Sequence, residues 1–367
     1  MLTTEVSNAQ RSLSKHATVG LLCHDFRPDS GRGVDRYSFY LGTNLTNFVN
    51  VRLVQVGKIK KYPKDWLTKV WRYPFTTMKT KADVFHATSY LDGSVAALTK
   101  RRPLVTTIHD LLPLKISEKD YHPTRSPVKD FYESSCIRVS TGSDVIITPF
   151  KVYIDDIVVA LNYPRDRIRQ VYYGVDHDFF QPQIGERKIT RKLLYVGGLN
   201  QEKGIFDLVA AFRELRKSLD NVSLVIGGRG PHEDRLRHLL AEENLQDHVS
   251  LLGFVKEADL PELYRSVDLL IVPAKTGFSL MSLESMSCGT PTIVGDTPDN
   301  REVITDEQLR CPIGNYRELV NKIFNILSVD KKITDLSKDV IGLASKYSWR
   351  KMASETNSVY TELLKKS

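Results

Sequence analysis

Residues 268–296 read DLLIVPAKTGFSLMSLESMSCGTPTIVGD, and their pattern predicts one βαβ unit. The apolar run 269–273 is long enough for a buried strand and too short for a helix. A polar loop follows, and the next segment, 280–287, has apolar residues at helical spacing that Ser279 can cap. A second apolar run begins at residue 292. The loop therefore follows the carboxyl end of a strand, where open α/β sheets bind ligands.

The start of the predicted helix suits a phosphate group. The first amides of a helix have no partner within the helix, and the helix dipole adds positive charge there. We therefore expect a nucleotide diphosphate to be bound by the residues that open this helix, which are Gly277, Phe278, Ser279 and Leu280. Glu284 lies about a turn and a half further on. Its carboxylate can accept hydrogen bonds from ribose hydroxyls.

The run GFSLMSLESMSCGTPTIV, residues 277–294, resembles the donor-site signature of retaining GT-B glycosyltransferases, specifically glycosyltransferase family 4. That family usually has two glutamates separated by seven residues, with Gly-Phe-Gly-Leu-Pro between them. Glu284 matches the second glutamate, whereas Thr276 stands at the place of the first. Ser279 and Met281 replace the second glycine and the proline. The resemblance therefore implies a donor site in which one carboxylate against the sugar is missing.

Further motifs extend the resemblance over about residues 17–365. The segment GGLNQEKG, residues 197–204, resembles the family pattern G-R-L-x-x-x-K-G. Lys203 matches the lysine that neutralises the donor diphosphate, and Gly198 replaces the arginine. Arg229, in a following Gly-x-Gly-Pro turn, can supply the charge that Gly198 lacks. The resemblance also implies that the loop at Phe254 contacts the nucleotide base.

The first half of the chain carries the motifs that the family uses near the acceptor. Gly33 follows a predicted strand and opens a helix, as in the family loop near the point of sugar transfer. The run VTTIHD ends a strand at His109, and the resemblance places this imidazole under the donor sugar, where it binds a hydroxyl and supports developing charge. We interpret His86, at a similar strand end, as structural. Tyr173 stands where the family has asparagine in V-x-N-G-V-D.

Length and periodicity predict two domains. The chain has 367 residues, enough for two α/β domains of ordinary size. We expect an α/β protein of GT-B architecture, with two Rossmann-like domains facing across a cleft. Residues 1–180 form the acceptor domain, and residues 191–345 form the nucleotide-sugar donor domain after a polar linker at 181–191. The resemblance implies that the last helix, 346–367, crosses back to the first domain.

Charge is unevenly distributed. Residues 1–180 carry 26 Lys and Arg against 18 Asp and Glu, whereas residues 181–367 carry 26 of each. Residues 57–81 hold eight basic residues and one acid, with interleaved aromatic residues. Cationic stems beside amphipathic rings favour an anionic membrane surface. We assign membrane or acceptor contacts to Lys58, Lys60, Lys61, Trp66 and Trp71. A solvated basic connection remains the alternative, and nucleic acid is disfavoured.

Composition indicates a cytoplasmic protein that is peripheral on the inner face of the membrane. No stretch reaches the roughly 18–20 apolar residues that span a bilayer, and the N-terminus has no apolar signal region. The four cysteines lack metal-ligand spacing, so we expect reduced thiols. Asp176-His177-Asp178 has an Asp-x-Asp pattern, but the resemblance implies that no metal is needed. We therefore expect no cofactor.

The sequence thus predicts a retaining hexosyltransferase. The donor is a nucleotide diphosphate-sugar, and the acceptor is a glycan or a polyprenyl-linked molecule. His109, Lys203 and Glu284 are the predicted catalytic residues. Two alternatives remain. The first is a catalytically weak nucleotide-binding partner protein of the same fold, because the family's arginine and glutamate are missing at Gly198 and Thr276. The second is a phosphorylase or sugar-nucleotide epimerase, which can use the same scaffold.

Overall fold

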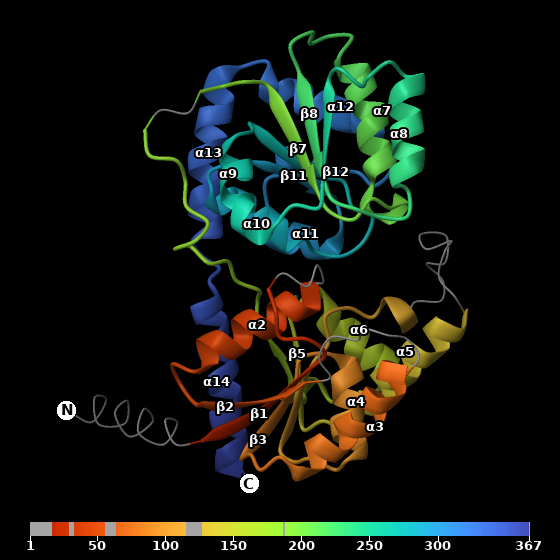
Figure 1. Cartoon of the computed structure of the whole chain (residues 1–367). Helices are drawn as coiled ribbons and strands as arrows, with labels where there is room; N and C mark the ends of the chain where they lie inside the picture. The colour runs from red at the N-terminus through yellow and green to blue at the C-terminus, as the bar shows by residue number, and fades with distance from the viewer. Residues whose placement is uncertain (1–16, 29–32, 56–63, 115–126, 186–187, 367) are drawn as a thin grey trace, which may run out of the picture. The chain divides into compact units, whose positions relative to one another are not determined.

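The chain folds into two compact units. The computed structural model describes residues 17–28, 33–55, 64–114, 127–185 and 188–366, with only the backbone at 64–71 and 127. Unit 1 ends at Gly174 and resumes at Trp349, and unit 2 is Val175–Ser348. Each unit contains one six-stranded parallel sheet with helices (Figure 1). The predicted α/β class is confirmed.

Unit 1 is built on a sheet in the order β2-β1-β3-β4-β5-β6. Its strands are β1 (Thr18–Cys23), β2 (Asn50–Gln55), β3 (Val84–Ala87), β4 (Leu104–Thr107), β5 (Val145–Thr148) and β6 (Ile168–Gln170). The three central strands β3, β4 and β5 are buried at every residue. Such continuous burial is typical of parallel strands that are covered on both faces.

The helices of unit 1 follow the strands in alternation. They are α2 (Gly33–Leu45), α3 (Lys64–Lys79), α4 (Tyr90–Leu98), α5 (Pro127–Ser140) and α6 (Val152–Leu161), with short 3-10 turns η1 (Leu112–Leu114) and η3 (Arg165–Arg167). The last helix of the chain, α14 (Trp349–Lys366), packs against α2, where the Trp349 and Tyr40 rings stack at 4.9 Å. Arg169 also forms an ion pair with Glu362 of α14.

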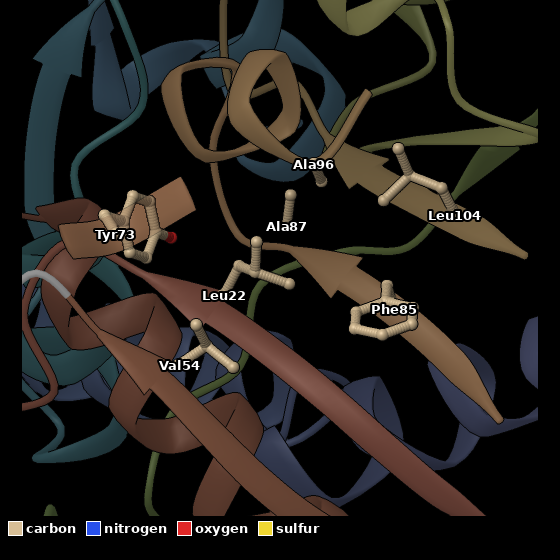
Figure 2. Close-up of a cluster of buried hydrophobic side chains, with 7 residues drawn as sticks. All are labelled: Leu22, Val54, Tyr73, Phe85, Ala87, Ala96 and Leu104. Atoms are coloured by element: carbon tan, nitrogen blue, oxygen red, sulfur yellow. The ribbon is translucent and has the colours of Figure 1, made fainter. Parts of the chain in front are cut away.

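One core cluster of unit 1 lies between the sheet and helices α3 and α4. Figure 2 shows side chains from β1 to β4 converging with those of the two helices; the cluster is Leu22, Val54, Tyr73, Phe85, Ala87, Ala96 and Leu104. Tyr73 donates its hydroxyl hydrogen to Asp92 at 2.8 Å, so its polar end is satisfied inside the core.

Unit 2 repeats the same architecture with the order β12-β11-β10-β7-β8-β9. Its strands are β7 (Lys192–Val196), β8 (Ser223–Gly227), β9 (Val249–Gly253), β10 (Leu269–Val272), β11 (Thr292–Gly295) and β12 (Arg310–Cys311). Its helices are α7 (Ile205–Leu215), α8 (Glu233–Glu242), α9 (Leu260–Arg265), α10 (Leu280–Ser287), α11 (Pro298–Val303), α12 (Tyr316–Leu327) and α13 (Asp330–Ala344), with 3-10 turns η4 (Gln201–Lys203), η5 (Glu257–Asp259) and η6 (Glu307–Leu309).

The chain enters unit 2 a few residues before the polar segment 181–191. Val175 forms a parallel bridge with Ser348, so the entering and leaving strands lie side by side. Ser287 donates its hydroxyl hydrogen to the Phe180 carbonyl at 2.6 Å, and Arg265 donates to the Gln181 carbonyl at 3.1 Å. These bonds attach residues 175–181 to unit 2, which therefore begins at Val175, before the predicted end of the first domain at residue 180.

Candidate functional site

Three loops meet at the carboxyl edge of the unit 2 sheet. They follow β7, β8 and β10, which are neighbours or next neighbours in the parallel sheet. The Leu199 amide donates to the Arg229 carbonyl at 3.1 Å, which joins the first two loops. The Lys275 amide donates to the Glu202 carbonyl at 2.9 Å, which joins the first loop to the third. The sequence motifs around residues 198, 229 and 277 are therefore brought together.

Two glycines allow this close packing of backbone. Gly228 has φ +139°, and a Cβ atom there would lie 1.8 Å from the Gly197 carbonyl oxygen. Gly204 has φ +73°, and its Cβ would lie 2.1 Å from the Pro273 carbonyl oxygen. Neither position has room for a side chain. The loops can consequently approach each other backbone to backbone.

Lys203 presents an exposed ammonium group at this edge. It ends the turn η4, which is capped by Asn200 through a 2.9 Å bond from the Lys203 amide to the Asn200 side-chain oxygen. Its ammonium group has no partner among the described residues, and neither has the exposed guanidinium of Arg229. Gly198 contributes its carbonyl oxygen to the Tyr195 hydroxyl at 2.7 Å. Two cations without an acidic partner thus lie on loops joined by hydrogen bonds.

The start of α10 has unpaired polar groups. Ser279 occupies the N-cap position with an extended backbone, as predicted. Its side chain makes no capping hydrogen bond, so that part of the prediction is wrong: the Ser282 amide bonds to the Ser279 carbonyl instead. The buried hydroxyls of Ser279 and Ser282 have no hydrogen-bond partner among the described residues. The same holds for the amides of Leu280 and Met281.

The loop before α10 is half-exposed. Gly277 adopts φ +76° in open space, and Phe278 follows it. The Thr276 hydroxyl has no partner among the described residues, and it stands where the resemblance has a carboxylate. The neighbouring Lys275 is paired with Asp207 at 3.5 Å.

Glu284 lies deeper than its predicted role suggested. It is 3% exposed and accepts a 3.1 Å hydrogen bond from the Tyr264 hydroxyl. Tyr264 lies at the end of α9 and was assigned no role from the sequence. A single sequence carries no signal for this pairing, because it joins two helices separated by β10.

Phe254 is half-exposed after β9, at the mouth of a different pocket. This pocket has a volume of about 500 Å³ and is lined by Leu252, Phe254, Val255, Ala258 and Leu263, with Asp259 and Glu262 among its walls. Two carboxylates there would repel a diphosphate. This pocket is therefore less suited to a phosphate than the loop edge around Lys203.

In unit 1, His109 follows β4 and uses both ring nitrogens within the unit. Nε2 lies 2.7 Å from the Thr88 carbonyl oxygen, and Nδ1 lies 2.8 Å from the Tyr173 hydroxyl. Burial lowers the pKa of His109 to about 4, against the opposing effect of the Thr88 carbonyl. Its predicted hydrogen bond to a sugar hydroxyl therefore requires exchange of one of these partners. Tyr173 and Thr88 were not predicted as site residues.

His86 is confirmed as structural. It is fully buried in β3, and its two nitrogens contact Tyr360 and Thr107. Burial lowers the pKa of His86 to about 3, with a smaller contribution from His109. A neutral imidazole that is hydrogen-bonded at both nitrogens inside the core stabilises the sheet, and its burial keeps it away from any substrate.

The structure describes the remaining predicted residues of unit 1 only in part. Gly33 is the exposed first residue of α2. Trp66 and Trp71 fall on α3, where only the backbone is described. Lys58, Lys60 and Lys61 lie outside the described residues. Residues 64–79, taken in sequence as part of a basic connection, form a helix.

Metal ligands do not cluster in the described part of the chain. No group of three or more His, Cys, Asp and Glu side chains there is placed to hold a metal ion. In the Asp176-His177-Asp178 pattern, Asp176 accepts two backbone amides, and His177 contacts Ser287 at 2.9 Å and the Tyr347 carbonyl at 2.9 Å. Among the described helices, none combines the length and apolar character needed to cross a membrane.

Known proteins resemble both halves of the chain. The family profile described as Glycosyltransferase Family 4 matches residues 5–179, and that described as Glycosyl transferases group 1 matches residues 176–341. An uncharacterized glycosyltransferase of Methanocaldococcus jannaschii is 29% identical over 238 residues, which is 59% of each chain. The O-antigen chain mannosyltransferase B of Escherichia coli is 26% identical over 268 residues, covering 70% of this chain and 69% of that one.

Solved structures share the fold at low identity. Sucrose-phosphate synthase of Thermosynechococcus elongatus has a TM-score of 0.78 and 19% identity, covering 96% of this chain and 100% of that one. HepE of Anabaena, solved in complex with UDP-glucose, has a TM-score of 0.74 and 16% identity, covering 96% and 100%.

Proposed function

The chain belongs to glycosyltransferase family 4 of the GT-B class, and we propose that it moves a hexosyl group from a nucleotide diphosphate-sugar to a lipid-linked or saccharide acceptor. In this proposal unit 2 binds the donor and unit 1 binds the acceptor, during synthesis of a cell-surface glycan or glycolipid. The HepE structure contains UDP-glucose, and the E. coli relative is a mannosyltransferase, which supports a nucleotide-hexose donor.

One observation carries the proposal: the loop edge of unit 2 combines an unpaired ammonium group with unpaired backbone and hydroxyl groups. Lys203 supplies the ammonium, and the start of α10 supplies the amides of Leu280 and Met281 with the hydroxyls of Ser279 and Ser282. A diphosphate is the ligand class that satisfies such a set, because its oxygens accept hydrogen bonds from amides and balance a lysine charge.

The proposed chemistry is glycosyl transfer with retention at the anomeric carbon. As the bond from sugar to phosphate breaks, negative charge grows on the leaving diphosphate. Lys203 and the amides at residues 277–281 stabilise that charge more strongly than they stabilise the bound donor, which lowers the barrier. The leaving phosphate accepts the proton of the acceptor hydroxyl, so no separate base is assigned. No metal or other cofactor is part of the proposal.

A donor panel tests this function. The purified protein is incubated with UDP- and GDP-hexoses and with polyprenyl-linked and free saccharide acceptors, and products are identified by mass spectrometry. We expect one donor to give an acceptor that is heavier by one hexosyl unit. Absence of any transfer across the panel, despite measurable nucleotide binding by calorimetry, would contradict the proposal.

That outcome would support the second candidate, a nucleotide-binding protein without efficient transfer. The observation that favours it is the pair of substitutions at the loop edge. Gly198 and Thr276 stand where the family usually has an arginine and a glutamate. The Thr276 hydroxyl makes no hydrogen bond to a carboxylate among the described residues. Calorimetry and the donor panel together separate the two functions.

We also propose that unit 1 contacts an anionic membrane surface. Arg72, Phe75, Thr76 and Lys79 follow helical spacing on α3 and are all exposed, and Phe75 is 60% exposed. Met78 on the same helix is exposed as well. An exposed aromatic ring between cations suits a lipid headgroup region, where each basic residue contributes about 1 kcal/mol of attraction to anionic lipid.

Vesicle flotation tests the membrane contact. We expect binding to vesicles with anionic lipid at low salt and loss of binding in the double variant Phe75→Ser, Met78→Ser. Leu252→Ser, which removes an exposed leucine of unit 2, is the matched control and should float like the unsubstituted protein. Equal flotation of all three proteins, or none at low salt, would remove α3 from the proposal.

A further inference from the structure

His109 is held from two sides by groups of different hydrogen-bonding character. On one side, the Thr88 carbonyl oxygen lies 2.7 Å from Nε2. A carbonyl only accepts hydrogen bonds, so Nε2 carries the hydrogen. On the other side, the Tyr173 hydroxyl lies 2.8 Å from Nδ1. A neutral imidazole with its hydrogen on Nε2 has a lone pair on Nδ1, and the tyrosine hydroxyl is the donor that fits it.

From this arrangement we infer that Tyr173 is a positioning residue, which holds His109 as a neutral imidazole with its hydrogen on Nε2. The inference rests on the proposed function in one respect only: His109 is a predicted residue of the sugar site. It adds that His109, when it exchanges the Thr88 carbonyl for a sugar hydroxyl, donates its Nε2 hydrogen as an uncharged ring and does not transfer a proton to the substrate.

Packing fixes the orientation of both rings. The Tyr173 and His109 rings are stacked, with centroids 5.9 Å apart and planes inclined by 21°. Tyr37 meets His109 edge-on at 4.7 Å, and Phe150 meets Tyr173 edge-on at 5.5 Å. The Tyr37 hydroxyl is engaged with Thr107 at 3.0 Å. The imidazole is therefore enclosed by aromatic rings as well as held through both nitrogens.

The titratable surroundings agree with a neutral ring. Tyr37 and Tyr173 face it, and His86 lies beyond Thr107 on the neighbouring strand. Asp110 follows it in the chain and accepts the Leu112 amide at 3.1 Å. Burial keeps the pKa of His109 near 4, so the ring is uncharged at neutral pH.

Tyr173 departs from the family pattern at this position. The family pattern has asparagine at this place, and a tyrosine reaches further from the backbone. Its hydroxyl connects the end of the β6 segment with the end of β4, and these strands are separated by β5 in the sheet. The substitution thus brings a hydrogen-bond donor to His109 from two strands away.

Nuclear magnetic resonance of protein with ¹⁵N-labelled histidine tests the inference directly, because the two imidazole nitrogens report the tautomer. His109→Gln assigns the signal. In the unsubstituted protein we expect the Nε2–H form and no titration between pH 5 and pH 8. In Tyr173→Phe the Nδ1 lone pair loses its donor, so we expect the Nδ1 resonance to move, while burial still keeps the ring uncharged in that range.

Tyr172→Phe is the matched control, since it removes a hydroxyl from the adjacent tyrosine, and the His109 signal should stay unchanged. In transfer assays Tyr173→Phe should lower kcat by about tenfold, the loss typical of one buried hydrogen bond, with KM for the donor unchanged. An unsubstituted protein with its hydrogen on Nδ1, or an unchanged His109 signal in folded Tyr173→Phe, would overturn the inference. The resonance data need no substrate, so a failed donor panel with the expected tautomer would count against the proposed function alone.

Discussion

The Tyr360 hydroxyl of α14 lies 2.5 Å from Nδ1 of His86 in β3, although the two residues are 274 positions apart. The other nitrogen of His86 lies 2.8 Å from Thr107 Oγ1, which also contacts the Tyr37 hydroxyl. All four side chains are buried. The last helix is thereby linked to the centre of the unit 1 sheet through a neutral histidine.

This linkage predicts that the protein loses stability as the pH falls. The pKa of His86 is about 3 in the folded chain, because burial lowers it from the value of about 6.5 that an unperturbed histidine has. Below pH 6.5 the unfolded chain gains a proton that the folded chain does not, so the free energy of unfolding decreases by about 1.4 kcal/mol per pH unit for this residue. The contribution is lost progressively between about pH 6.5 and pH 3.

Urea unfolding from pH 7 to pH 4 measures the slope of the unfolding free energy against pH. His86→Gln should lower it by about one proton relative to the unsubstituted protein. His238→Gln changes an exposed histidine of α8 and should leave the slope as it was. A His86→Gln protein with an undiminished slope would contradict the assignment.

Lys203→Ala should reduce kcat/KM for transfer by about 100-fold, because it removes a cation placed against the growing charge of the diphosphate. The thermal midpoint should not change, since the side chain is exposed and makes no hydrogen bond or ion pair with the described residues. Lys217→Ala, which removes an exposed lysine paired with Glu214, is the control. Transfer at the unsubstituted rate in Lys203→Ala would remove Lys203 from the site.

Glu284 allows stability and nucleotide binding to be separated. Glu284→Ala opens a cavity and removes the carboxylate that accepts the Tyr264 hydrogen bond, which should cost about 2–4 kcal/mol of unfolding free energy. Glu284→Gln keeps the volume and an oxygen for Tyr264, so it should remain folded. If Glu284 binds the ribose, calorimetry should show about tenfold weaker nucleotide binding in Glu284→Gln. Unchanged affinity would leave Glu284 with a structural role only.

Gly204→Ala should destabilise unit 2 by about 3 kcal/mol or more, because the new Cβ would meet the Pro273 carbonyl and the backbone is left-handed. Gly253→Ala is a matched control, since Gly253 has φ +66° but no atom within 4 Å of a Cβ. It should cost only about 1 kcal/mol, the strain of the left-handed backbone. Urea-unfolding midpoints compare the two, and equal losses would contradict the close approach at Gly204.

Local pattern was sufficient for many elements of the fold. Helix 280–287 has the bounds that the sequence predicts, and the apolar run 269–273 contains strand β10, because each is a short segment between clear stops. The helical residues 330–344 were not predicted, although they form α13. The segment begins with charged residues and has no side-chain cap, so its start carried little local signal.

The candidate site was predicted in its parts but not in its pairings. Lys203 and the start of α10 could be located because backbone amides and a lysine follow from motif spacing. The Tyr173 contact to His109 and the Tyr264 contact to Glu284 could not, since each depends on which strands and helices become neighbours. The burial of Glu284 likewise depends on the packing of α9 against α10.

Because α14 belongs to unit 1 but follows unit 2 in the sequence, unit 2 is fully synthesised before unit 1 is complete. All of Val175–Ser348 has been synthesised before Tyr360 is available to bond His86. Unit 2 can therefore reach its final packing during translation, whereas unit 1 waits with one face of its sheet unfinished until the last helix emerges. Truncation before α14 should for this reason expose the β3 histidine to water and leave unit 2 intact.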